Sequence, residues 1–180
     1  MSKLVAVEYL SLDGVFDEPG WSGPYFNDEV GAFQTNNLFG SDAMLLGRKT
    51  YEGFARAWPT MPDDEQGFGK RMNALPKFVV TKSTAAPEWN ATFLSGDIDA
   101  QISALKANPG GDLLLNGSGE LLTYLSSRGL VDEYRFMVFP ILLGKGRRLF
   151  PENVGELPLR LTKSQITSSG VAILTYEPDR

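Results

Sequence analysis

The chain has 180 residues, of which 42% are hydrophobic and 22% charged, so it holds enough apolar material for one globular domain. Its formal net charge of -5 argues against general affinity for nucleic acid, because such binding neutralises phosphates with lysine and arginine. The sequence has no cysteine and no histidine, which excludes disulfides, thiolate zinc sites, cysteine nucleophiles and imidazole catalysis. Acid–base chemistry therefore falls to carboxylates, lysine, tyrosine or water, and a redox cofactor with its own chemistry suits such a chain.

The first ten residues contain one lysine and an acid, Glu8, and so do not resemble a signal peptide. No apolar run approaches the roughly 18 residues that indicate a membrane-spanning helix. We therefore expect a cytoplasmic protein whose partner is a small molecule, with no membrane, nucleic acid or metal ion involved.

Short apolar runs alternate with amphipathic stretches along most of the chain, a pattern typical of strands alternating with helices. In the first half we predict strands at residues 3–10, 43–46 and 77–81, helices at 28–37 and 48–57, and a surface loop at 61–69. In the second half we predict strands at 91–94, 112–116, 133–139, 157–165 and 171–176, and helices at 98–107 and 120–127. A hairpin at residues 168–170 joins the last two strands. This order predicts a mixed α/β sheet flanked by helices, with an antiparallel C-terminal end.

The segment 112–122, DLLLNGSGELL, is a buried strand that runs into Gly117-Ser118-Gly119 and then directly into a helix. Glycine lets the backbone approach a ligand closely, and the free N–H groups at a helix start attract phosphate. The segment does not complete G-x-G-x-x-G, because residue 122 is leucine, and an ordinary tight turn has the same pattern. A phosphate site and an ordinary turn both stay open on this segment alone.

A second strand-to-helix junction, AMLLGRKT at residues 43–50, places Arg48, Lys49 and Thr50 at the start of a helix. Two cations there oppose the helix dipole, and a bound anion would resolve that conflict. Solvated charges at a surface turn are the alternative. A third strand end is followed by Thr81, Lys82 and Ser83, which add hydroxyl groups and a charge.

These three junctions, within GRKTYE (47–52), PKFVVTKS (76–83) and LLLNGSGELL (113–122), resemble dihydrofolate reductase. With SLDG (11–14) and FPILLGKGRRLF (139–150), the chain resembles still more the reductase domain of bacterial riboflavin biosynthesis, the RibD C-terminal domain, and its stand-alone relatives. The resemblance implies one domain over residues 1–180 with the dihydrofolate reductase-like three-layer fold. The central sheet of that fold is mixed, mostly parallel and has about eight strands. The resemblance also implies a homodimer.

The resemblance further implies a site for NADPH. Its phosphates would be held by the stretch that comprises Gly47, Arg48, Lys49 and Thr50, with Thr81 beyond it. Arg48, Lys82 and Ser83 would face the adenosine 2′-phosphate, which favours NADPH over NADH and suits a planar guanidinium. The second glycine loop, along the pyrophosphate and nicotinamide, comprises Gly117, Ser118, Gly119, Glu120 and Leu121.

The substrate side resembles dihydrofolate reductase less closely. Trp21 and Pro24 resemble residues that precede its substrate helix. The position of the acid that anchors the pterin in that enzyme is occupied by Phe26 in this chain. Two candidate catalytic acids remain. Asp28 is displaced from the expected position and is also a normal first-turn helix acid. Asp13 lies in the SLDG segment and is also a normal residue of an Asp-Gly turn.

The candidates for an aromatic wall around a flat substrate are Tyr9, Trp21, Tyr25 and Phe54, although aromatic residues at such positions commonly belong to the core. The basic segment 143–150 is either a site for a substrate phosphate or a solvated loop. These features predict an NADPH-dependent reductase that transfers hydride to a C=N or C=O group of a small pteridine- or pyrimidine-like substrate. The alternatives are a non-catalytic NADP(H)-binding protein and a specific reductase of dihydrofolate or of a riboflavin precursor.

Overall fold

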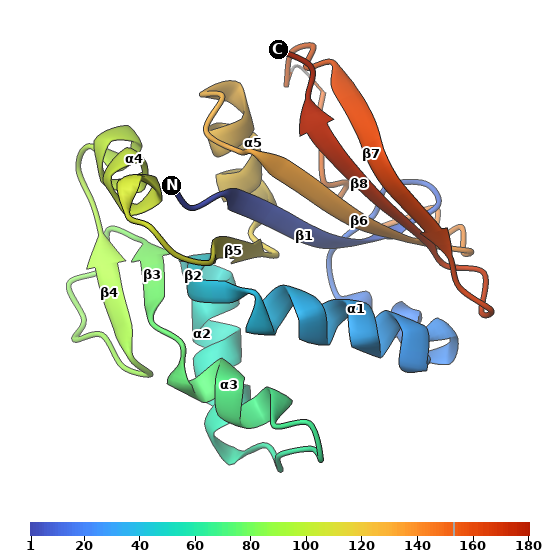
Figure 1. Ribbon diagram of the computed structural model, residues 1–180, viewed down its shortest axis with the longest axis horizontal. Helices are drawn as coiled ribbons and strands as arrows, with labels where there is room; N and C mark the ends of the chain where they lie inside the picture. Colours follow the sequence, from blue (N-terminus) through green and yellow to red (C-terminus); the bar gives the residue numbers. More distant parts are fainter. Residues whose placement is uncertain (153) are drawn as a thin grey trace.

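The structure is a computed structural model that describes residues 1–152 and 154–180, and it is built on one eight-stranded sheet (Figure 1). The strands are β1 (Leu4–Ser11), β2 (Ser41–Gly47), β3 (Lys77–Val80), β4 (Ala91–Leu94), β5 (Asp112–Asn116), β6 (Glu133–Phe139), β7 (Leu159–Ile166) and β8 (Ala172–Pro178). The α-helices are α1 (Asp28–Phe39), α2 (Arg48–Ala57), α3 (Phe68–Ala74), α4 (Ile98–Ala107) and α5 (Gly119–Ser127). Two short 3-10 helices are η1 (Pro19–Tyr25) and η2 (Trp58–Thr60).

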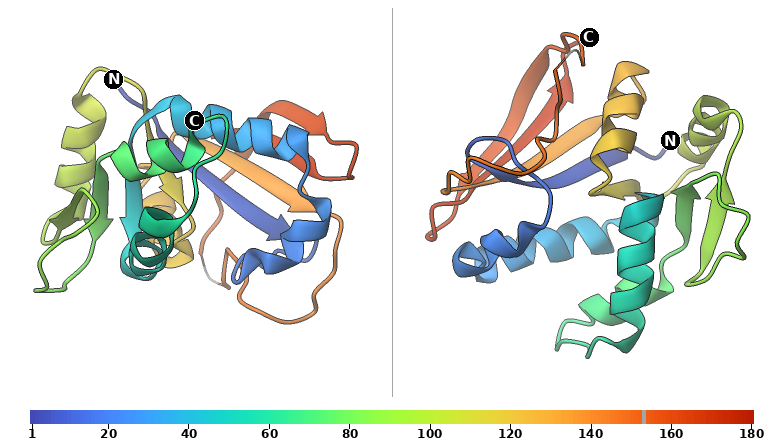
Figure 2. Two further views of the ribbon diagram at one scale, coloured as in Figure 1. Left: turned by 90° about the horizontal axis from the view of Figure 1, so that it is seen from below. Right: turned by 180° about the vertical axis from the view of Figure 1, so that it is seen from behind.

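The strand order is β4-β3-β2-β5-β1-β6-β8-β7. The first six strands are parallel, and β8 is antiparallel to both β6 and β7. The connection from β1 through α1 to β2 runs along the sheet in one direction, whereas that from β5 through α5 to β6 runs in the other. Because crossovers between parallel strands are right-handed, these two helices lie on opposite faces. Figures 1 and 2 show α1, α2 and α3 on one face and α4 and α5 on the other.

Each face of the sheet buries its own apolar core. Val5 and Val7 of β1 lie in the core that also contains Val30 of α1, whereas Leu4 and Ala6 lie in the core that contains Leu122 of α5 and Ile102 of α4. Because successive strand residues point to opposite faces, this alternation fixes the register of β1 in the middle of the sheet.

Most predicted elements are present at or near their predicted bounds, and helix α4 begins after Asp97, whose side chain accepts a hydrogen bond from the N–H of Ala100. The prediction of a loop over residues 61–69 was wrong at its end, because α3 begins at Phe68. Two loop acids cap that helix. Asp64 Oδ1 accepts from the N–H of Phe68 at 2.9 Å, and Asp63 Oδ1 accepts from the N–H of Lys70 at 3.1 Å. In the sequence these acids resemble ordinary loop residues, because they cap the helix only when the loop before it folds back toward its first turn.

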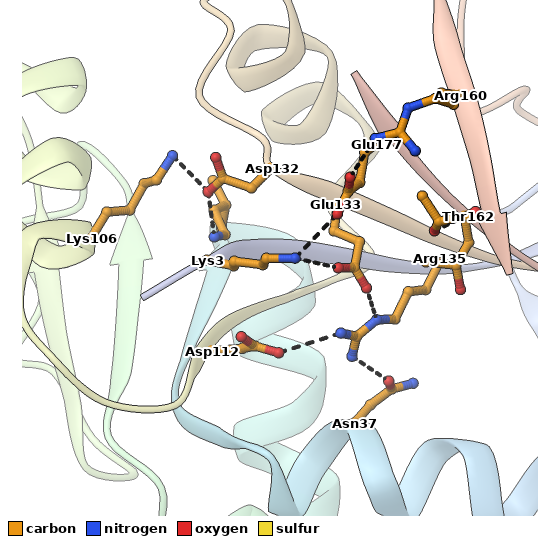
Figure 3. A network of polar contacts seen from close by, with 12 residues as sticks. Lys3, Asn37, Lys106, Asp112, Asp132, Glu133, Arg135, Arg160, Thr162 and Glu177 are labelled. Atoms are coloured by element: carbon orange, nitrogen blue, oxygen red, sulfur yellow. Dashed lines mark hydrogen bonds and ion pairs between the residues drawn. The ribbon is translucent and has the colours of Figure 1, made fainter. Parts of the chain in front are cut away.

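A polar network joins the amino-terminal ends of the central strands (Figure 3). Glu133, at the start of β6, accepts hydrogen bonds from Lys3 at 3.0 Å and from Arg135 at 2.6 Å. Arg135 also donates to Asn37 of α1 at 2.7 Å and forms an ion pair with Asp112 of β5 at 3.4 Å. The network therefore ties β1, β5, β6 and α1 together at the edge of the sheet opposite the carboxyl ends of these strands. Within the described ranges, no helix combines the length and apolar character that crossing a membrane requires.

Candidate functional site

A crevice opens at the carboxyl ends of β1 and β5, where the chain connections diverge. The ladder between these strands ends at the pair Val7 and Asn116, after which β5 turns at Gly117 into α5. Since β1 continues to α1 on one face and β5 to α5 on the other, this is the switch point of the sheet. Ligands of open α/β sheets bind at such points, just beyond the carboxyl ends of the strands.

The two predicted glycine turns meet at this crevice and are bonded to each other. The N–H of Gly47 donates to the hydroxyl oxygen of Ser118 at 2.7 Å, and that hydroxyl donates to Thr50 Oγ1 at 2.9 Å. Glycine is required at Gly117, where φ is +60° and an added Cβ would lie 3.1 Å from Thr50 Oγ1. The ends of β2 and β5 thus form one rigid unit from two segments about 70 positions apart in sequence.

A cavity of about 520 Å³ lies against this unit. The helices α2 and α5 both begin at it, and neither N-cap, Gly47 or Ser118, has a side-chain hydrogen bond to the first turn. First-turn N–H groups of both helices are therefore available to an anion. Three cations line the cavity, namely Arg48, Lys49 and Arg147. Uncapped helix starts beside cations are suited to phosphate groups, so the residues present fit the phosphates of a dinucleotide.

The remaining predicted cofactor residues divide into two groups. Gly119, Glu120 and Leu121 line the small cavity with Ser118. Thr81, Lys82 and Ser83 lie at the end of β3, the neighbour of β2, but outside the residues that line the cavity. Thr81 is buried and its Oγ1 accepts from the N–H of Ser83 at 3.0 Å. Lys82 and Ser83 are exposed.

The basic segment 143–150 was predicted to be either a site for a substrate phosphate or a solvated loop. Within it, Arg147 is exposed and lies beside the start of α5. Its guanidinium carbon is 5.6 Å from the centroid of the Phe16 ring, and Nη2 is 3.4 Å from Glu120 Oε1. The neighbouring Arg148 donates from Nε to the carbonyl oxygen of Asp13 at 3.1 Å. The basic segment therefore contributes Arg147 to the small cavity and not to the larger cleft described next.

A larger cleft of about 1710 Å³ adjoins the small cavity, and Phe16, Lys49, Thr50 and Ser118 line both. Two of the predicted wall residues, Tyr9 and Phe54, line this cleft, and Tyr9 Oη accepts a hydrogen bond from Gln34 at 2.7 Å. Other aromatic residues complete its lining, namely Phe16, Phe26, Trp58 and Phe68. Phe68 belongs to the helix that the sequence did not predict.

Trp21 and Tyr25 lie outside the residues that line the cleft. Both pack against Phe139 at the end of β6, with ring centroids at 5.6 Å and 6.4 Å and nearly perpendicular or steeply tilted rings. This edge-to-face packing is the core role that is common for aromatic residues. The two side chains thereby pack η1 against the end of β6.

The two predicted catalytic acids have different surroundings. Asp28 is exposed at the first position of α1 and lines the large cleft. Asp13 lies outside the lining residues, and its carboxylate accepts from the Ser11 hydroxyl at 2.6 Å and from the N–H groups of Gly144 and Leu143 at 2.8 Å and 3.1 Å. These hydrogen bonds, that from Ser11 foremost, lower the pKa of Asp13 far below its usual range. Asp13 therefore anchors the loop after β6 as a carboxylate.

The structure adds one acid that the sequence interpretation did not select. Glu8 of β1 is only 3% exposed and lines the large cleft, yet its Oε1 has no hydrogen-bond partner among the described residues. Burial alone raises the pKa of the Glu8 carboxyl well above its usual range. The available signal was a charged residue inside the otherwise apolar run LVAVEYL.

The fold and this crevice define an α/β domain with a candidate anion site at the switch point of its sheet. The chain belongs to the RibD C-terminal domain family, which it matches over residues 2–173. The uncharacterized protein YyaP of Bacillus subtilis (strain 168) is 31% identical over 137 residues, which are 75% of this chain and 73% of YyaP.

Two solved structures are similar to the whole chain. A protein from Shewanella sp. PV-4, assigned by its name to riboflavin biosynthesis, gives a TM-score of 0.80 at 25% identity over 100% of both chains. Dihydrofolate reductase from Enterococcus faecalis, solved with NADP(H), gives a TM-score of 0.68 at 15% identity over 99% of this chain and 97% of its own. The predicted family and the dihydrofolate reductase-like fold are thereby confirmed. Family and fold support a reductase domain of the riboflavin or folate type.

Proposed function

We propose that this protein is an NADPH-dependent reductase that transfers hydride to a small, uncharged or cationic heterocycle. The observation that carries the proposal is the joined pair of glycine turns. The Gly47–Ser118 hydrogen bond brings two uncapped helix starts and three cations to one cavity, which is continuous with a large aromatic cleft. A dinucleotide has both parts that this arrangement suits, a phosphate-rich end and a flat ring.

NADPH would lie with its phosphates at the starts of α2 and α5 and its nicotinamide toward the large cleft. Arg48, together with Lys82 and Ser83 at the neighbouring strand end, would hold the 2′-phosphate, because a guanidinium suits a phosphate dianion. The bound cofactor supplies the hydride. The protein's part is to orient the two rings and to exclude water, which the aromatic residues lining the cleft support.

The charge of the large cleft bears on the substrate class. Apart from the buried Glu8, whose protonated form is favoured, its described lining holds five acids, namely Asp17, Glu18, Asp28, Asp64 and Glu65, and a single cation, Lys49, at the border with the small cavity. A phosphate-bearing substrate would meet this negative field and be disfavoured, whereas a neutral or protonated ring would be favoured. The cleft therefore supports a pteridine- or pyrimidine-like ring without a phosphate over a phosphorylated riboflavin precursor. Asp28, which faces the cleft, is the candidate to bind the ring's N–H groups.

Separate titrations of NADPH and NADH into the wild type and Arg48→Ala test the cofactor site. We expect NADPH to bind more tightly than NADH, with a loss in Arg48→Ala that is confined to NADPH. Lys70→Ala, which changes an exposed cation on α3 away from the small cavity, is the matched control. Absence of binding by either nucleotide would refute the reductase proposal. Binding without NADPH oxidation by any acceptor in a panel of pteridines and pyrimidines would instead indicate a non-catalytic binding protein.

A further inference from the structure

Glu8 has no structural role that explains a buried carboxyl in the central strand. Its Oε1 is buried without a hydrogen-bond partner in the described parts of the chain, and no cation contributes to its electrostatic surroundings. A buried polar group without a hydrogen-bond partner destabilises the fold by about 1–3 kcal/mol. A ligand that supplies the missing hydrogen bond at a cleft removes this destabilisation when it binds. The carboxyl is therefore a candidate ligand contact.

The register of the sheet places Glu8 next to the second glycine turn. Val7 pairs with Asn116, the last residue of β5, so Glu8 is the first residue of β1 beyond that ladder and is level with Gly117. On its other side Glu8 pairs with Phe136 of β6. Glu8 thus lies where β5 leaves the sheet, in the lining of the large cleft.

The alternation of β1 indicates on which face Glu8 lies. Val5, Val7 and Tyr9 belong to the core beneath α1, whereas Leu4, Ala6 and Leu10 belong to the core beneath α5. Glu8 follows the second set and points to the face of α5 and Phe16, which is the face of the second glycine turn. Asp28, at the start of α1, lies on the other face. The two acids therefore approach a ligand in the crevice from opposite sides.

We propose that Glu8 binds the carboxamide group of the nicotinamide ring and so fixes which face of the ring meets the substrate. A protonated carboxyl has one O–H donor and one C=O acceptor, and a primary carboxamide has the complementary N–H donor and C=O acceptor. The two groups can form a pair of hydrogen bonds in one plane. Burial favours the protonated form that this pairing needs. The inference rests on the proposed function, because it requires NADPH in the crevice.

The experiment compares two ligands by isothermal titration calorimetry in the wild type, Glu8→Met and Glu8→Gln. One ligand is NADPH, and the other is 2′-phospho-ADP-ribose, which has the same phosphates but no nicotinamide. We expect Glu8→Met to weaken NADPH binding about tenfold and to leave 2′-phospho-ADP-ribose binding unchanged, because only the carboxamide contact is lost. Glu8→Gln keeps a donor and an acceptor and should stay within about threefold of the wild type for both ligands.

The outcomes are separable. NADPH binding that is equal in Glu8→Met and the wild type would overturn the inference, and so would an equal loss for both ligands, which indicates a general structural effect. If the wild type binds 2′-phospho-ADP-ribose and NADPH equally well, the nicotinamide makes no contact and the inference also fails, while the dinucleotide site stands. If the wild type binds neither ligand, the proposed function itself fails.

Discussion

The Ser118 hydroxyl offers the sharpest test of whether the two glycine turns act as one unit. Ser118→Ala removes the acceptor of the Gly47 N–H at 2.7 Å and the donor to Thr50 at 2.9 Å. The substitution leaves the Gly47 N–H without this partner, and because both bonds are partly buried, water replaces them only in part. We expect a loss of about 2 kcal/mol in the free energy of unfolding, within the usual range for an unsatisfied buried group. For a chain of this size that loss lowers Tm by about 4–8 °C.

The matched control is Ser127→Ala, since Ser127 lies on the same helix and its hydroxyl donates to the carbonyl of Tyr124 in an exposed position. Urea denaturation of both variants measures the stability difference, and calorimetric titration measures NADPH affinity. The loss of Ser118 should weaken NADPH binding about tenfold or more, because the two helix starts are no longer held together. If Ser118→Ala behaves as Ser127→Ala does in both assays, the turns are independent and the reasoning is refuted.

Three further predictions concern stability and cofactor access. Burial lowers the pKa of Lys77 to about 8, so the unfolded chain binds more protons between pH 8 and 10.5 and stability rises with pH there. From pH 7 to 10 the free energy of unfolding of the wild type, measured by urea denaturation, should rise by about 2–3 kcal/mol relative to that of Lys77→Met. A difference between the two proteins that stays constant with pH would contradict this. Burial raises the pKa of Glu8, so its contribution to stability is lost as pH rises above about 4.5. Glu8→Met should therefore have a higher Tm than the wild type at pH 7, with a gap that narrows toward pH 4.5. At Gly119 an added Cβ would lie 2.5 Å from the Phe16 ring, so Gly119→Ala should displace that ring and weaken NADPH binding in fluorescence titrations. The control is Gly23→Ala, which should not weaken binding, because Gly23 has open space around it and lines neither cavity.

The fold was predictable because strands and helices alternate with clear periods, and because Gly47 and Gly117 mark two strand-to-helix junctions that local chemistry explains. The meeting of these junctions was also predictable, since the carboxyl ends of parallel strands share one edge. Hydrogen bonds between residues far apart in the sequence were not predictable. Asp13 looked like a free turn acid, but its carboxylate is held by Leu143 and Gly144, some 130 positions later.

The substrate side was less predictable because it depends on tertiary packing. Trp21 and Tyr25 are aromatic, as a wall around a flat substrate requires. Both pack against Phe139 and do not line the cleft. Phe68 lines the cleft only because Asp63 and Asp64 start a helix that no local pattern announced. Glu8 lay in a strand that was predicted correctly, but nothing local shows that its carboxyl lacks a partner.

The central position of β1 has a consequence for synthesis of the chain. Among the described residues this strand pairs with β5 and β6, which are made roughly 100 residues after it. At a ribosomal rate of about 5–20 residues per second, the apolar run LVAVEYL waits for roughly 5–20 s without its partners. During that time both of its edges are open to other strands, so we expect dependence on chaperones during translation. While the strand is unpaired, the Glu8 carboxylate is exposed to water and charged, so it interrupts this run and makes it a poorer template for aggregation.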